Sequence, residues 1–311
     1  MSLYRTPKSD NLSFSFKILE YRILKLNSNS NILARYIPQF IWYGSENQYS
    51  YWMTDFSSGD FGTSYRDRKP VGLKVGTALK WTLIISLISI LLSYSIGIPL
   101  GVYSAKNHNS PVERVISTTL FSIHSIPSFW LASLLIIFLA SYEYLPIFPS
   151  YGLGLFDHHE SPFSEFVDLA YHLVLPVICW SYSGIAYISE QTKRSVLNEL
   201  SSDYIRTARA KGLGEKQIYW KHALKNASFP LITQFGNLFP ALISGSFVIE
   251  YIFAIPGMGK LLLDSIALRD YPVVFSILMI SAVLILIGTL VSDLLYLKFD
   301  KRISLSKQTA V

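Results

Sequence analysis

Long apolar runs alternate with short polar segments from about residue 81 to the end of the chain. Each run has roughly twenty residues or more, the length that crosses ~30 Å of hydrocarbon. The pattern predicts five membrane spans, at about 81–104, 115–140, 169–189, 227–249 and 273–291. It therefore predicts an all-α, polytopic membrane domain.

Residues 1–75 are mixed polar and aromatic, with no run long enough to span a membrane. Within them, FSFKILEYRILKLN alternates apolar and charged residues and fits an amphipathic helix or a strand equally well. We expect three parts in the chain: this N-terminal region, a transmembrane domain over 76–302, and a tail of residues 303–311.

The distribution of basic residues predicts the orientation. Residues 143–168 contain no Lys or Arg, so we expect this loop outside the cytoplasm. The 190–226 loop, the turn with Lys106 and Arg114, and the tail carry many basic residues and are expected in the cytoplasm. These assignments alternate correctly over five spans and place the N-terminal region outside, although that region is itself basic.

Composition agrees with a membrane protein, because 15% of the residues are charged and 50% are hydrophobic. Soluble domains carry about 25% charged residues. The net charge of +6 lies in loops between apolar runs, which indicates cytoplasmic loops and not a nucleic-acid partner. The single cysteine, Cys179, lies inside an apolar run, which excludes a disulfide framework.

The most basic stretch is SSDYIRTARAKGLGEKQIYWKHALKN, residues 201–226. It predicts two short helices that meet at residues 212–214. Ser201, Ser202 and Asp203 are candidate N-terminal caps for the first helix.

Ile205, Ala208 and Gly212 fall on one face of this first helix and are small enough for close approach by another surface. Gly212 is a natural left-handed stop, and Glu215 opens the second helix. Two interpretations remain open at this point: a docking surface for a partner, or an ordinary basic loop on the cytoplasmic side.

Motifs for catalysis are weak. GMGKL at 257–261 resembles the end of a phosphate-binding loop, but Ala254 and Leu261 stand where that loop needs Gly and Ser or Thr. His158, His159 and Glu160 fit an exposed polar loop better than a metal site. No series of acidic or His residues runs through the spans, which disfavours a proton-coupled carrier.

Residues 203–227, DYIRTARAKGLGEKQIYWKHALKNA, resemble the cytoplasmic coupling loop of ABC importer permeases, in particular the oligopeptide, dipeptide and nickel branch. The family loop has an EAA---G pattern. With Gly212 on the family glycine, Arg206, Thr207 and Ala208 occupy the EAA positions, so only the last alanine is kept. The peptide branch has a DYxRTARAKG core, which this chain matches throughout.

Other segments resemble the same branch in the same order: GDFGTSYRDRKPV at 59–71, IPLGVYSA at 98–105, SIPSFW at 125–130, HLVLP at 172–176, and IPGMG followed by RDYPVV within 255–274. Relatives begin with a span that precedes the first of these motifs. The apolar pattern has no such span, so we expect five spans where relatives have six, with the usual first helix missing.

The resemblance implies the type I permease fold of a bacterial ABC importer in the inner membrane, a transport subunit and not an enzyme. It implies a second permease subunit, generally a different chain, two ATPase subunits, an extracytoplasmic solute-binding protein that delivers peptides, and the lipid bilayer, with no nucleic acid. This chain itself would bind no cofactor, since ATP-Mg belongs to the ATPase subunits. The contact with them would use eight residues of the loop: Asp203, Tyr204, Arg206, Thr207, Ala208, Ala210, Lys211 and Gly212. Nickel or another small solute is the alternative cargo, and a truncated scaffold without transport the alternative role.

Gln234 and Asn237 in the fourth span are three residues apart and share a helix face. Pro230 and Pro240 interrupt the same span and free backbone carbonyls for neighbours or water. We predict that the Gln234/Asn237 face lines the translocation path. The alternative is that these amides only tie helices together.

Overall fold

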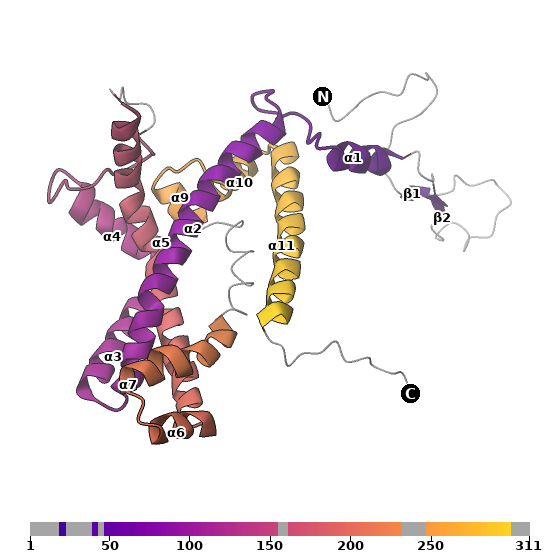
Figure 1. The fold of residues 1–311 in the computed structure, drawn as a ribbon. Helices are drawn as coiled ribbons and strands as arrows, with labels where there is room; N and C mark the ends of the chain where they lie inside the picture. Colours follow the sequence, from indigo (N-terminus) through magenta and orange to yellow (C-terminus); the bar gives the residue numbers. More distant parts are fainter. Residues whose placement is uncertain (1–18, 23–38, 43–46, 155–160, 232–246, 300–311) are drawn as a thin grey trace, which may run out of the picture.

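The computed structural model describes residues 19–22, 39–42, 47–154, 161–231 and 247–299 (Figure 1). Its elements are, in chain order, β1 (Leu19–Arg22), β2 (Gln39–Trp42), α1 (Gln48–Ser57), α2 (Val71–Lys106), α3 (Pro111–His124), α4 (Ser128–Ala140), α5 (Pro162–Leu200), α6 (Asp203–Ala210), α7 (Glu215–Gln217), the π-helix η2 (Ile218–Ala223), α9 (Phe247–Ile252), α10 (Met258–Ala267) and α11 (Tyr271–Phe299). Helical conformation continues from η2 over 224–231.

Three described helices are long and apolar enough to cross a membrane: α2, α5 and α11. They contain the predicted spans 81–104, 169–189 and 273–291 and extend past each of them. The predicted span 227–249 lies mostly on residues outside the described part of the chain.

The predicted second span, 115–140, is not one straight helix. It consists of α3 and α4, which are bent by 93° and count together as a fourth candidate span. Pro127 explains the break, because proline lacks an N–H and disfavours helical conformation in the residue before it. Helix α5 satisfies polar groups at the bend: the Tyr182 hydroxyl donates to the Ile126 carbonyl, and Ser183 Oγ lies 2.9 Å from His124 Nδ1.

Helices α2 and α5 form the most extensive helix pair, and their backbones approach closely because small residues line the contact. A Cβ atom on Gly101 would lie 2.5 Å from the Ser189 carbonyl oxygen. On Gly184 it would lie 2.6 Å from Ser93 Oγ. Small residues at such contacts give membrane helices their van der Waals packing.

Apolar clusters continue this packing along the pair. Val71, Met258 and Val273 join the start of α2 to α10 and α11. A second cluster joins α2 to α4, α5 and α9, and a third joins the ends of α2 and α5 to α6 and η2. Helices α10 and α6 therefore lie at opposite ends of α2 (Figure 1).

The N-terminal region, for which the sequence left helix and strand open, contains the antiparallel pair of β1 with β2. Alternating apolar and charged residues suit a strand as well as a helix, and here cross-strand pairing decides between the two. The rest of the described chain is helical apart from turns, loops and one isolated bridge between Thr63 and Pro70.

Candidate functional site: a helix pair at one end of the bundle

The predicted break between two short helices is present at residues 211–214. Gly212 has φ +76°, the left-handed conformation that favours glycine. Its N–H donates to the Arg209 carbonyl at 2.9 Å, and the Leu213 N–H donates to the Ala208 carbonyl at 3.3 Å, which closes α6. Glu215 opens α7, so both predictions about this break are confirmed.

The start of α6 differs from the prediction. Ser202 is the N-terminal cap residue, but its side chain makes no capping hydrogen bond. The Ser201 hydroxyl instead donates to the Asn198 carbonyl at the end of α5. Asp203 lies in the first turn of α6, where a negative charge is favourable, and its carboxylate lies 3.4 Å from Arg206.

The small face of α6 packs against its own chain. Ile205 and Ala208 are both buried, and Ile205 lies in one cluster with Val102, Val196 and Ile218. The surface that approaches this face at Ile205 is thus formed by the ends of α2 and α5 and by η2. The contact of Ala208 with an ATPase subunit stays a prediction.

The other predicted coupling residues share an exposed face or edge of the α6 segment: Asp203, Tyr204, Arg206, Thr207, Ala210, Lys211 and Gly212. The ion pairs here, Asp203–Arg206 and Arg209–Glu215, are solvent-exposed at 3.4 Å. Exposed pairs of this kind contribute little to stability. This surface is therefore polar, mainly basic, and available for contact.

Tyr204 is held at the edge of this surface by a hydrogen bond from its hydroxyl to the Glu199 carboxylate. Burial and this hydrogen bond raise the pKa of Tyr204 to about 12. The phenol therefore keeps its proton at neutral pH and ties α6 to the end of α5.

The π-helix η2 follows directly after α7. Its wider turn places Ile218, Tyr219 and Ala223 in the buried cluster and leaves Trp220 exposed. Single π turns inside helices are frequent at functional sites. No residue type in IYWKHA predicts this turn, and sequence reasoning missed it.

The two predicted path residues, Gln234 and Asn237, lie outside the described residues. The described part of the chain contains no cluster of His, Cys, Asp and Glu with the geometry to hold a metal ion. His158, His159 and Glu160 also lie outside it.

At the opposite end, a buried carboxylate holds the start of α10. Glu250 is fully buried and accepts hydrogen bonds from Thr82 Oγ1 at 2.8 Å and from the N–H groups of Gly259 and Lys260 at 2.8 and 3.1 Å. Thr82 Oγ1 in turn accepts from the Met258 N–H at 2.8 Å. The first N–H groups of a helix need such partners.

This carboxylate explains the IPGMG segment. A Cβ atom on Gly257 would lie 2.4 Å from the carboxyl carbon of Glu250, so no larger residue fits there without rearrangement. The amides that would bind phosphate in a phosphate-binding loop bind Glu250 instead. The resemblance of GMGKL to such a loop therefore has a structural cause, a helix start that binds a carboxylate.

A second buried carboxylate, Asp270, lies just before α11. It accepts hydrogen bonds from Ser64 Oγ at 2.5 Å and from the Tyr65 N–H at 2.9 Å, and Lys74 Nζ lies 3.8 Å away. Asp270 therefore joins the RDYPVV segment to the GDFGTSYRDRKPV segment. Sequence reasoning noted both segments but missed Glu250 and Asp270 as the buried carboxylates that hold them by hydrogen bonds.

The fold is that of an ABC transporter membrane subunit. The structure is similar to a chain of the inward-facing MetNI methionine ABC transporter, with a TM-score of 0.58 and 18% identity over 73% of this chain and 96% of that one. At this identity the similarity concerns the fold alone.

Residues 97–305 match the family of binding-protein-dependent transport system inner membrane components, and the chain belongs to that family. It is 40% identical over 267 residues to the oligopeptide transport system permease AppB of Bacillus subtilis, which covers 86% of this chain and 81% of the relative. It is 35% identical over 268 residues to the dipeptide transport system permease DppB of Alkalihalophilus pseudofirmus, which covers 82% and 80% of the two chains. The protein is thus an inner membrane permease subunit of the peptide-permease branch, and family membership implies ATPase and binding-protein partners.

Proposed function

We propose that this permease imports peptides, which a solute-binding protein delivers and which pass between this chain and a second, different permease chain. The observation that carries the proposal is 40% identity to an oligopeptide permease over most of both chains. The Gln234/Asn237 face remains part of the proposal as a wall of the path.

The exposed surface of α6 is the proposed contact with an ATPase subunit, which binds ATP-Mg. Ile205 fixes α6 to the ends of α2 and α5. A push on α6 would therefore reach both long helices, and closure of the ATPase pair would rock the spans between outward and inward access.

The proposed membrane topology has five spans, with 227–249 as the fourth. The segments expected outside are 141–168 and 250–272. Their described parts lie toward one end of the bundle, while α6 and the 107–110 turn lie toward the other (Figure 1). Cys179 is buried, so introduced cysteines can be labelled against a low background. Leu268→Cys should react with an impermeant thiol reagent in intact cells and Lys216→Cys only after lysis; the reverse pattern would contradict the orientation.

The function is tested by uptake of labelled peptides in cells that depend on this transporter. Gly212→Val should abolish uptake, because valine is strained at φ +76°. Gly214→Val is the matched control: Gly214 lies in the same loop at φ −66°, with no atom within 4 Å of an added Cβ.

Both variants should insert in the membrane at the wild-type level. Wild-type uptake by Gly212→Val would contradict the coupling role of α6. Uptake of nickel without uptake of peptides would instead favour a small-solute importer. If deletion of the gene reduced neither peptide uptake nor nickel uptake, a scaffold role would be favoured.

A further inference from the structure

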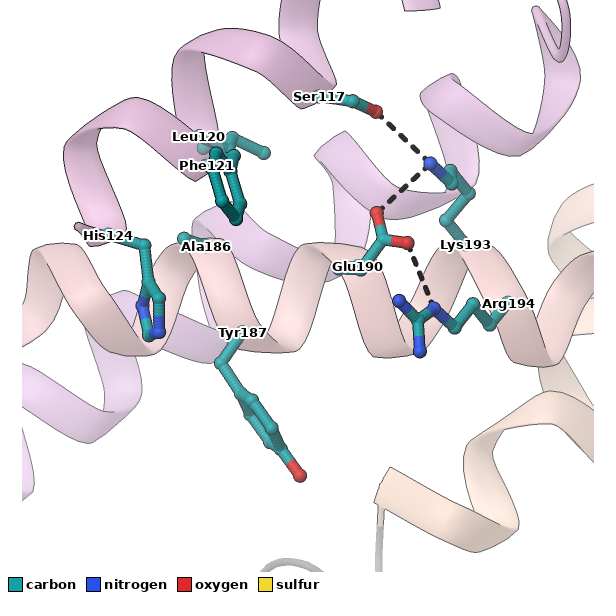
Figure 2. Close-up of a pocket in the computed structure, with 9 residues that line it drawn as sticks. All are labelled: Ser117, Leu120, Phe121, His124, Ala186, Tyr187, Glu190, Lys193 and Arg194. Atoms are coloured by element: carbon teal, nitrogen blue, oxygen red, sulfur yellow. Dashed lines mark hydrogen bonds and ion pairs between the residues drawn. The ribbon is translucent and has the colours of Figure 1, made fainter.

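A pocket of about 330 Å³ lies between α3 and α5. Its lining residues are Ser117, Leu120, Phe121, His124, Ala186, Tyr187, Glu190, Lys193 and Arg194 (Figure 2). None of the predicted coupling residues lines this pocket, and the two predicted path residues lie outside the described part of the chain.

At the polar end of the pocket, Lys193 uses all its N–H donors, whereas Arg194 has N–H donors that can bind a further group. Lys193 Nζ lies 2.9 Å from Glu113, 3.1 Å from Ser117 Oγ and 3.0 Å from Glu190, so its three donors are all engaged (Figure 2). Arg194 donates through Nε to Glu190 at 2.9 Å. That bond uses one of its five N–H groups, and its side chain is 70% exposed.

The other end of the pocket is mainly apolar. Leu120 and Phe121 of α3 lie toward Ala186 of α5, and His124 and Tyr187 also line this end (Figure 2). Phe121 is 73% exposed and Tyr187 47% exposed, and no residue of α3 is buried. The pocket is thus amphipathic, with a guanidinium at one end and an aromatic wall at the other.

On the orientation proposed above, the two ends match the layers of the inner leaflet. Arg194 lies five residues past the predicted span end at 189, about 7 Å along a helix, at the level of the lipid headgroups. Phe121 lies six residues inside the predicted start at 115, about 9 Å into the hydrocarbon. A peptide path would need polar walls at that depth, and here the walls are apolar.

We propose that this pocket binds an anionic phospholipid of the inner leaflet, with its phosphate on Arg194 and an acyl chain along Leu120, Phe121 and Tyr187. Guanidinium groups bind phosphate through paired N–H donors. Arginine side chains near the cytoplasmic surface of a membrane attract anionic headgroups.

The test measures lipids retained by the tagged full chain, together with the subunits that copurify with it. The purified protein is incubated with phosphatidylglycerol or with phosphatidylcholine and analysed by native mass spectrometry. Wild type should retain phosphatidylglycerol in preference to phosphatidylcholine. Arg194→Gln should weaken this retention about five-fold, the contribution of one cation near an anionic surface, while Arg194→Lys should keep most of it.

Arg114→Gln is the matched control, since Arg114 is exposed near the same end of α3 but lies outside the pocket. It should retain phosphatidylglycerol as wild type does. Phe121→Ala should shorten retention of the lipid without changing the headgroup preference.

Equal retention by wild type and Arg194→Gln would overturn the proposal, as would equal loss in Arg114→Gln. Loss of peptide affinity in Arg194→Gln with lipid retention unchanged would assign the pocket to the substrate. The readout is lipid mass, so a failure of the chain to import peptides leaves this test unaffected.

Discussion

Helices α6 and α10 are short helices at opposite ends of α2, and they are attached in different ways. Helix α6 has eight residues and is held by the buried side chain of Ile205 and by an exposed hydrogen bond from Tyr204 to Glu199. Helix α10 has ten residues, and its start is fixed by hydrogen bonds to Glu250 and Thr82. In the interior, the α6 end thus relies on apolar packing, whereas the α10 end adds a buried carboxylate.

This difference has mechanical consequences. Apolar contact is non-directional, so α6 can shift on its cluster while most of the buried area is kept. A buried carboxylate is costly unless it stays hydrogen-bonded, so small displacements of α10 are opposed. We therefore expect the α6 end to move during coupling and the α10 end to stay rigid.

The largest expected effect follows from Glu250→Ala, which leaves Thr82 and the N–H groups of Gly259 and Lys260 without their acceptor. The unfolding free energy should fall by several kcal/mol, because each buried donor left without an acceptor costs about 1–3 kcal/mol. Thermal unfolding of the purified chain measures it. Asp264→Asn on the same helix is the control, because Asp264 pairs only with Lys260 near the surface and should change stability by less than about 1 kcal/mol.

Ile205→Ala should come next, because it removes the main apolar anchor of α6. Ile205 is fully buried, and such truncations cost about 2–5 kcal/mol. The loss should be local, with faster trypsin cleavage at Arg206 and Lys211 and unchanged protection around α10. Thr207→Ala, at an exposed position of α6, should leave cleavage unchanged; if it accelerates cleavage equally, apolar anchoring is not the cause.

A smaller effect is expected for Thr82→Val, which keeps the shape of the side chain and removes its hydroxyl. Glu250 then loses one donor and the Met258 N–H its acceptor, at about 1–3 kcal/mol. The double variant with Glu250→Ala should lose less unfolding free energy than the sum of the two single variants, because both residues belong to one hydrogen-bond network. Simple additivity would show that Thr82 and Glu250 act separately.

The smallest effect concerns pH and the loop before α2. Burial alone raises the pKa of Asp67, but its polar contacts, among them the hydrogen bond from the Lys69 N–H and the ion pair with Lys74, outweigh burial and lower the pKa to about 2 from an ordinary 3.8. A lowered pKa means that Asp67 stabilises the loop above about pH 4 and that this contribution is lost as the pH falls toward 2. As the pH falls from 5 to 2, the rate of proteolysis within residues 58–70 should rise more steeply in wild type than in Asp67→Asn. Parallel curves would contradict a stabilising role of the Asp67 carboxylate.

Local sequence features determined much of this protein. The apolar runs located α2, α5 and α11, because a hydrophobic run of sufficient length needs no distant partner to become a helix in a bilayer. Gly212 marked the end of α6, because a left-handed residue is a property of its own backbone. The ordered motifs identified the family.

Long-range contacts decided the rest. Ile205 on the small face of α6 packs against the ends of α2 and α5, and the helical period of the sequence does not say which surface covers that face. The bend between α3 and α4 depends on Tyr182 and Ser183 of α5 as well as on Pro127. Thr82 and Glu250 are 168 residues apart, and no local pattern connects them. Helix period and turn chemistry act between near neighbours, whereas the choice of a buried partner depends on which surfaces the packed helices bring together.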